Sequence, residues 1–262
     1  MNIAVCAKTA PDTATPIRTK ADGSGIETAG VKFVVSAYDA FAIEEAVQLK
    51  EKGAASKVHV FSVGDDEAIN QLRSGALAVG ADDLTVCQDA AAQGADSLGT
   101  ARVLAAMIQA TPDIGLVLLG NKATDFDSSA VPSMLAELLG WPAVTMVTAF
   151  SIDGGTFKAT RNVGGGVSEI VTGALPAVIS ADKGLNAPRL AKLPDIVKSK
   201  TKPVHKKALG DLGLSADDIA PRAITSSFSP PPPRPKGRIL AGDIDTQVAE
   251  LVRLLRDEAK VL

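Results

Sequence analysis

Aromatic side chains are scarce in this sequence, whose 262 residues include one Trp, one Tyr and seven Phe. Proteins that bind single-stranded nucleic acid stack its bases on aromatic rings, so this scarcity argues against such a surface. The formal net charge is only −3, which also argues against nucleic acid as the main partner. We therefore expect partners of another class.

Cysteine and histidine are nearly absent, with two residues of each. Cys6 and Cys87 lie in separate apolar runs, which is typical of buried thiols rather than of a redox or metal site. No His, Cys or carboxylate cluster has metal-ligand spacing, and no Ser–His–acid set stands out. We expect no metal and no catalytic centre that belongs to this chain alone.

Long apolar runs are missing too, since none approaches the roughly 20 residues that a membrane span needs. The first residues, "MNIAVCAK", do not have the layout of a signal peptide. We expect a cytoplasmic bacterial protein without membrane insertion. With 46% hydrophobic residues, the chain can form one large domain with an appendage.

Short apolar runs alternate with helical patterns, which predicts an α/β fold with a parallel sheet flanked by helices. Residues 144–163 read as a β-hairpin around Asp153-Gly154-Gly155, followed by a buried strand over 173–182. The other expected strands span 2–8, 58–64, 84–88 and 114–120, and the expected helices span 40–53, 65–81, 97–111 and 129–140, the last with Ser at its cap, Pro132 in its first turn and Gly140 at its end.

The C-terminal part has a different texture, basic and rich in proline. The run "SPPPPRPKGR" (229–238) predicts extended polyproline. An amphipathic helix follows, with Val248, Leu251, Val252 and Leu255 on one face. We expect an α/β domain over 1–185 and, over 186–262, a docking loop and an arm that ends in this helix.

The stretch "IGLVLLGNKATDFDSSAVPSMLAELLG" (114–140) runs from a strand through Gly120 and a polar loop into a helix. Gly120 allows a close backbone approach, and a helix N-terminus offers unpaired N–H groups to a phosphate. The hydroxyls of Ser128 and Ser129 are suited to donate to it. The alternative is a simple helix cap by Asp127 or Ser128.

Several motifs in order resemble the β subunit of electron transfer flavoprotein over nearly the whole chain. They are "AVCAK", "GVKFVVSAYDAFAIEEAVQLKEKG", "LRSGALAVGAD", "LVLLGNKATDFD", "LPAVISADKGLNAPRLAKLPDIVKSK" and "KGRILAGD…LLRDEAKVL". The resemblance implies a Rossmann-like adenine-nucleotide-binding fold and a heterodimer. An α subunit carries most contacts to a redox FAD, and this chain holds AMP without a redox role. The heterodimer is an electron carrier, not an enzyme, between flavin dehydrogenases, such as the acyl-CoA dehydrogenases of fatty acid oxidation, and a membrane quinone oxidoreductase.

The resemblance also implies which residues contact the nucleotides. Tyr38, the only tyrosine, aligns near an aromatic that reaches the FAD ring in relatives, with packing on the core as the alternative. The full set is Cys6, Ser36, Ala37, Tyr38, Asp39, Val63, Gly120, Asn121, Lys122, Ala123, Thr124, Asp125, Phe126, Asp127, Ser128, Ser129, Ala130 and Val131.

The segment "RLAKLPDIVKSK" (189–200) matches the family's recognition loop, in which Leu193 is the exposed apolar anchor for partner dehydrogenases. A solvated basic turn is the alternative. The expected docking residues are Arg189, Lys192, Leu193, Pro194, Ile196, Lys198 and Lys200.

The sequence departs from the family at two places. Ser129-Ala130-Val131-Pro132 replaces a run with Gln and Gly, which leaves the backbone N–H groups of residues 128–131 as the main phosphate donors. Arg161-Asn162 replaces a common Arg-Glu, so Glu169 is a candidate for the charge that the hairpin lacks.

Two other functions stay open. In the same family, an electron-bifurcating β subunit holds a second FAD in place of AMP, and "AYDAFAIE" and "PPPPRPKGRILAG" are similar to that branch. A nucleotide-binding regulator or ATP-cleaving enzyme of related fold is less favoured, because "KTAPDTA" stands where a pyrophosphate loop would follow the first strand.

Overall fold

A nine-stranded sheet forms the centre of the protein in a computed structural model that describes residues 1–262. Its order is β11-β5-β4-β1-β6-β10-β7-β8-β9, and the strands from β11 to β7 run parallel while β8 and β9 add antiparallel pairs. The expected α/β class is confirmed. The strands are β1 (Asn2–Cys6), β4 (Val58–Val63), β5 (Asp83–Cys87), β6 (Ile114–Gly120), β7 (Ala143–Asp153), β8 (Thr156–Gly164), β9 (Val167–Ala174), β10 (Ala177–Ala181) and β11 (Val204–Lys207), with a separate pair, β2 (Thr9–Pro11) and β3 (Phe33–Val35).

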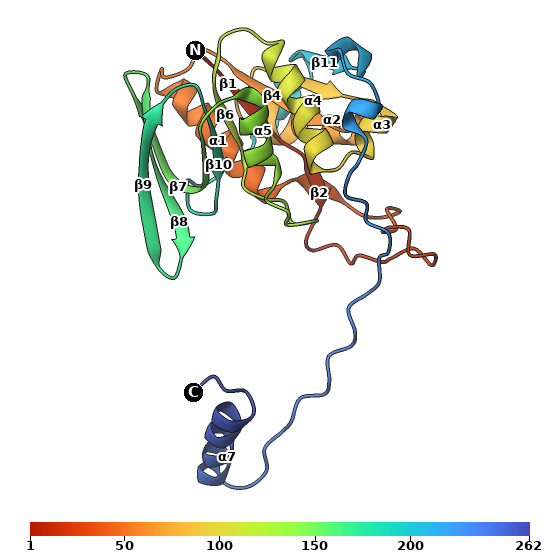
Figure 1. Ribbon diagram of the computed structural model, residues 1–262, viewed down its shortest axis with the longest axis vertical. Coiled ribbons are helices and arrows are strands. Elements are labelled where there is room, and N and C mark those ends of the chain that lie inside the picture. Colours follow the sequence, from red (N-terminus) through yellow and green to blue (C-terminus); the bar gives the residue numbers. More distant parts are fainter.

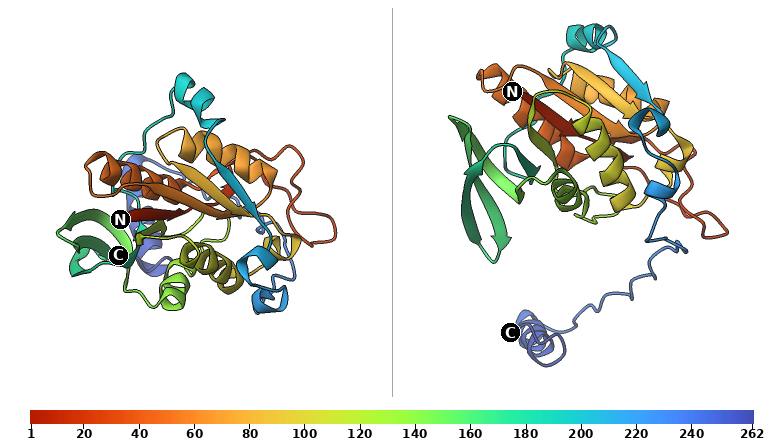
Figure 2. Two further views of the ribbon diagram at one scale, coloured as in Figure 1. Left: turned by 90° about the horizontal axis from the view of Figure 1, so that it is seen from above. Right: turned by 45° about the horizontal axis from the view of Figure 1, so that its top comes forward.

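Helices cover both faces of this sheet (Figures 1 and 2). Successive strand residues point to opposite faces, so Val5 joins an apolar cluster with α1 and α2, and Ala4 joins a second cluster with α4 and α5. The helices are α1 (Ala37–Glu51), α2 (Asp66–Leu72), α3 (Ala90–Gln93), α4 (Ser97–Gln109), α5 (Val131–Leu139), α6 (Leu193–Ser199) and α7 (Ile244–Asp257), with short 3₁₀ turns at η2 (Gly210–Leu212) and η3 (Asp217–Ile219).

Two of the predicted helices differ in detail. The helix expected over 65–81 is α2 followed by a π-helix, η1 (Arg73–Leu77). The predicted Ser cap of the 129–140 helix is wrong, because α5 starts at Val131 after Ala130 and no side chain caps it. Pro132 lies in the first turn and Gly140 ends the helix in the left-handed conformation, as predicted.

The predicted hairpin over 144–163 is β7 and β8, joined by Gly154 and Gly155. Both glycines have positive φ, which a two-residue hairpin turn requires. A third antiparallel strand, β9, was not predicted. The strand expected over 173–182 therefore divides, since its first residues end β9 and only Ala177–Ala181 form β10.

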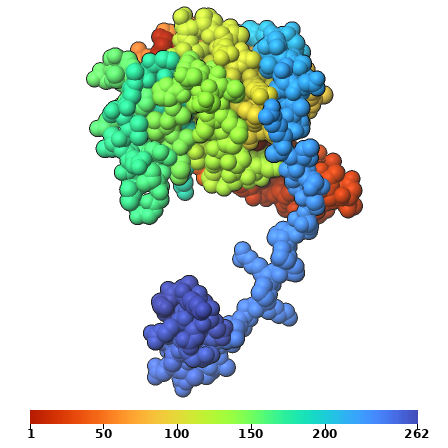
Figure 3. All heavy atoms as spheres, in the orientation of Figure 1, coloured from red at the N-terminus to blue at the C-terminus, as the bar shows by residue number.

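The main sheet and its core include residues beyond the predicted domain boundary at residue 185. β11 pairs with β5 at the edge of the main sheet, and Leu209 and Ile219 are buried in the cluster around α4. The last backbone hydrogen bond to the body is donated by Phe228 N to Gly23 O at 2.9 Å. Beyond it, an extended segment leads to α7, which stands away from the body (Figures 1 and 3).

The amphipathic character of α7 agrees with the prediction. Val248, Leu251 and Val252 lie on one face and are exposed. No helix in the structure combines the length and the apolar character needed to cross a membrane.

Candidate functional site

The predicted nucleotide-binding segments meet at the carboxyl edge of three neighbouring strands. Cys6, Val63 and Gly120 are the last residues of β1, β4 and β6. β1 pairs with β4 on one side and with β6 on the other, so the order of the strands reverses there. In open α/β sheets, ligands bind in the crevice at such a switch point.

Asp39 holds the three segments of this edge together. Its Oδ2 accepts the backbone N–H of Lys8, just after β1, at 2.9 Å, and its Oδ1 accepts that of Gly120 at 2.8 Å. Burial raises the pKa of Asp39 to about 7, against the lowering effect of these two hydrogen bonds. Its carboxyl group therefore bonds to the backbone of the protein, and it positions the ends of β1 and β6 relative to α1.

Gly120 is required by this close approach. A Cβ at this position would lie 2.5 Å from Asp39 Oδ1 and 2.8 Å from both the backbone N of Asp39 and the carbonyl C of Tyr38. Real Cβ atoms do not come so close to backbone atoms. The predicted reason for glycine here, a close backbone approach, is therefore met by α1 itself.

The loop before α5 presents free backbone donors. The N–H groups of residues 128–131 donate to no acceptor in the protein, and no side chain caps the helix. The alternative role, a cap by Asp127 or Ser128, is therefore not what the chain adopts. Ser129 has a φ of 52° and Ala130 is in the right-handed helical region. Such a pair turns successive N–H groups into one concavity, which is a typical anion cradle.

Lysines neutralise the loop's two carboxylates. Lys8 Nζ pairs with Asp125, and Lys122 Nζ lies 2.7 Å from Asp127 Oδ2. Both carboxylates of the loop are thus paired with a lysine, while Ser128 and Ser129 are exposed. Lys8 was not among the predicted residues, although its place directly after β1 is a signal that could have identified it.

Tyr38 lies at the mouth of the site. The ring is half-buried in the first turn of α1, and Lys122 Nζ stands 5.6 Å from its centroid. Its ring therefore lies close to the loop after β6. The hydroxyl of its neighbour Ser36 is buried without a hydrogen-bond partner.

The remaining predicted residues divide between the core and the surface. Asn121 is buried and accepts a hydrogen bond from Ser180 Oγ at 3.1 Å. The thiol of Cys6 is buried among apolar side chains, and this burial raises its pKa. Ala37, Thr124 and Phe126 are exposed, whereas Ala123 is half-buried. No group of three or more His, Cys, Asp or Glu is arranged to hold a metal ion.

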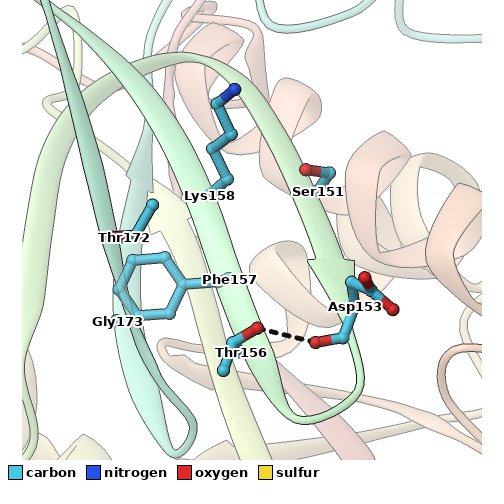
Figure 4. Close-up of a pocket in the computed structure, with 7 residues that line it drawn as sticks. All are labelled: Ser151, Asp153, Thr156, Phe157, Lys158, Thr172 and Gly173. Atoms are coloured by element: carbon cyan, nitrogen blue, oxygen red, sulfur yellow. Dashed lines mark hydrogen bonds between the residues drawn. The ribbon is translucent and has the colours of Figure 1, made fainter.

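A separate cavity of about 350 Å³ lies on the antiparallel part of the sheet (Figure 4). Thr156 Oγ1 donates to the carbonyl of Asp153 at 2.7 Å beside it. None of the predicted nucleotide or docking residues lines it. Its lining residues are Ser151, Asp153, Thr156, Phe157, Lys158, Thr172 and Gly173.

The predicted docking segment is helical where a loop or turn was expected. Leu193 begins α6 and its side chain is 76% exposed. Ile196 is half-buried against the body. The other exposed residues of the predicted set are Lys192, Pro194, Lys198 and Lys200.

Arg189 connects this segment to α1. Its Nε lies 2.8 Å from Glu44 Oε2, and its Nη2 lies 2.9 Å from Glu51 Oε2. Asn186 Nδ2 adds hydrogen bonds to the carbonyl of Phe41 and to Glu45 Oε2, both at 3.0 Å. The guanidinium of Arg189 is therefore occupied within the chain, where it ties the start of the docking segment to the body.

The hairpin carries the candidate charge pair. Arg161 on β8 lies opposite Glu169 on β9 in the strand register, with 3.6 Å between Nη1 and Oε2. Glu169 thus lies beside Arg161, which is followed in the sequence by Asn162 instead of a glutamate.

Comparisons with known proteins identify the family. The family model of the electron transfer flavoprotein domain matches residues 24–212. The chain is 38% identical to "Electron transfer flavoprotein subunit beta" of Bradyrhizobium diazoefficiens over the whole of both chains. It is 38% identical to the protein of the same name from Bacillus subtilis, with 90% of this chain and 91% of the relative covered, and 36% identical to that from Homo sapiens, with the same coverage. The chain therefore belongs to the electron transfer flavoprotein family, among relatives named as its beta subunit.

Proposed function

We propose that this chain is the β subunit of a heterodimeric electron transfer flavoprotein that binds AMP in a structural role. The observation that carries the proposal is the set of free N–H groups at residues 128–131 beside the switch point of the sheet. Phosphate oxygens are the usual acceptors for such donors. The lysine partners of Asp125 and Asp127 remove the repulsion that these carboxylates would exert on a phosphate.

The same edge helps to hold the FAD of the α subunit. When bound, FAD supplies the redox chemistry of the heterodimer. Tyr38 offers it an aromatic ring at the mouth of the site, and Lys122 adds a positive charge beside that ring. The chain's own residues position the cofactors and exchange no electrons themselves.

Docking of dehydrogenases takes place at α6. Leu193 is an exposed apolar side chain flanked by Lys192 and Lys198, and an apolar anchor within a charged rim suits a transient complex. The partners are flavin dehydrogenases such as acyl-CoA dehydrogenases, and a membrane quinone oxidoreductase receives the electrons. The arm and α7 wrap the α subunit, in the bacterial cytoplasm.

Replacement of Leu193 by Ala tests the docking part of this proposal. Burying the leucine in a partner contributes roughly 1.5–3 kcal/mol, so Leu193→Ala weakens the encounter about ten- to hundredfold. FAD content and melting temperature stay unchanged, because the side chain has few neighbours in its own chain. Ile224→Ala is the matched control, as Ile224 is also highly exposed but lies outside α6. A lower melting temperature with normal electron transfer would remove Leu193 from the docking surface.

A second candidate is a bifurcating β subunit that holds a second FAD in place of AMP. The stretches "AYDAFAIE" and "PPPPRPKGRILAG" favour it, because both are similar to that branch of the family. The two candidates share the phosphate cradle and differ in the nucleotide that lies in it.

A further inference from the structure

Helix α6 is too short to be stable alone. It has seven residues, and no side chain caps its N-terminus at Lys192. Helices of this length are not populated in water without tertiary contacts. Contacts with the body must therefore fix the direction in which α6 displays its side chains.

Arg73 caps the C-terminal end of α6. Its Nη1 donates to the backbone carbonyls of Ser199, Lys200 and Lys202 at 3.0, 3.2 and 3.4 Å. These carbonyls belong to the last turn of the helix and to the residues just after it, where the dipole is negative. A single guanidinium thus satisfies the end of the helix and holds it against η1.

Lys202, which follows α6, in turn contacts the end of η1. Its Nζ donates to the carbonyls of Leu77 and Ala81 at 2.8 and 2.6 Å, at the end of η1. Leu77 is the last residue of η1, and carbonyls at the end of a helix have no intrahelical N–H partner, so they are available to Lys202. Burial, together with the charge of Lys50, lowers the pKa of Lys202. Arg73 of η1 therefore caps the end of α6, and Lys202 after α6 caps the end of η1.

These reciprocal contacts of Arg73 and Lys202, called the clasp here, hold α6 in one orientation and so determine which side chains it exposes. Leu190 is 92% exposed, and Leu193 and Val197, four residues apart on one face of the helix, are 76% and 58% exposed. Ser199 on the opposite side is buried. We define the apolar ridge as Leu193 and Val197 on one face of α6, together with the exposed Leu190 three residues before the helix.

We propose that Arg73 and Lys202 are positioning residues for partner docking. They keep α6 folded and oriented before the partner binds, so that the ridge needs no ordering on binding. This inference rests on the proposed function, and it extends the docking surface from Leu193 to Leu190 and Val197. The partner it fits has an apolar pocket long enough for one helical turn and an acidic rim for Lys192 and Lys198. Loss of the clasp makes the partner order α6 on binding, which costs affinity without touching the contact itself.

The experiment measures electron transfer from a flavin dehydrogenase to the intact heterodimer as a function of heterodimer concentration. Arg73→Gln raises KM about three- to tenfold, with kcat at saturation and FAD content unchanged, and hydrogen exchange in residues 193–199 becomes faster. Arg73→Lys, which keeps a cation for the carbonyls, stays within about twofold of the natural chain. Arg102→Gln is the matched control, because Arg102 donates to the carbonyl of Asp218 in η3, away from α6.

A double variant tests whether the two residues act independently. Arg73→Gln adds an ordering cost that persists while α6 still docks through Leu190 and Val197, so its effect on KM multiplies that of Leu193→Ala within about twofold. Should Arg73→Gln prevent folding, Lys202→Met, which keeps the apolar stem, carries the same expectation for KM. No change of KM in either clasp variant while Leu193→Ala weakens docking, or a higher KM without faster hydrogen exchange in residues 193–199, would overturn the clasp. If Leu193→Ala is itself without effect, the proposed docking function fails instead.

Discussion

The backbone N–H of Gly120 donates to Asp39 Oδ1 at 2.8 Å, and this contact joins the end of β6 to the start of α1. The two residues are 81 positions apart in the sequence. Because the candidate phosphate loop starts directly after Gly120 and Tyr38 precedes Asp39, the contact fixes the two sides of the candidate nucleotide site relative to each other.

Replacement of Gly120 by Ala tests this geometry. The new Cβ would lie 2.5 Å from Asp39 Oδ1 and 2.8 Å from two backbone atoms of α1, so β6 and α1 must separate. We expect a loss of about 2–4 kcal/mol in the free energy of unfolding and loss of bound nucleotide. Gly115→Ala in the same strand is the control, because its Cβ meets the flexible side chain of Met1. Equal effects of the two changes, measured by denaturant unfolding, would contradict the account.

Replacement of Asp39 by Asn changes how stability depends on pH. The folded-state pKa of Asp39 is raised to about 7, above the roughly 3.9 of an unfolded aspartate, so its contribution is present below about pH 4 and is lost as pH rises through 7. Asn does not titrate. The stability of Asp39→Asn relative to the natural chain therefore rises between about pH 4 and 7 and levels off above pH 7, as denaturant midpoints from pH 4 to 8 will show. Parallel curves would mean that Asp39 keeps an ordinary pKa.

Two substitutions at Ser129 separate the backbone donors of the loop from its hydroxyl. Ser129 has a φ of 52°, which glycine adopts freely and valine resists. Ser129→Gly keeps the cradle and loses the hydroxyl, so bound nucleotide stays within about threefold of normal. Ser129→Val distorts the cradle and loses at least tenfold in affinity. If Ser129→Gly is the more damaging change, the hydroxyl holds the phosphate and the backbone does not.

Truncation after Phe228 tests the role of the arm. Residues 229–262 make no backbone hydrogen bond to the body, and α7 leaves Val248, Leu251 and Val252 exposed. Removing them should leave the melting temperature of the isolated chain within about 2 °C and should abolish co-purification with the α subunit. A marked drop in melting temperature would show that α7 packs on its own domain in solution.

The central parallel strands were predictable because both of their faces are apolar, which distinguishes them from half-buried strands. β9 was missed since "VSEIVTGA" is mostly exposed and mixes Ser, Glu, Thr and Gly with its apolar residues. β11, "VHKK", is an edge strand whose lysines resemble a solvated arm. It is placed by pairing with β5, a contact about 120 residues distant that no local pattern indicates.

The sequence predicts the main segments of the candidate site, but not the contacts that hold these segments together. Gly120 and the loop to Val131 follow from the strand–loop–helix order, and the family resemblance added Tyr38 and Asp39. The inward role of Asp39 and the pairing of Lys8 with Asp125 depend on how three segments converge in space. The sequence around α6 predicts a loop or turn because prolines and lysines interrupt it, although Pro194 occupies a first-turn position that suits a helix.

The nucleotide content of the purified heterodimer tests the central claim most directly. The protein is denatured, and the released nucleotides are separated by chromatography and identified by mass. The account predicts one FAD and one AMP per heterodimer, with AMP lost selectively in Ser129→Val. Two FAD and no AMP would establish the bifurcating candidate in its place, and no adenine nucleotide beyond a single FAD would contradict both.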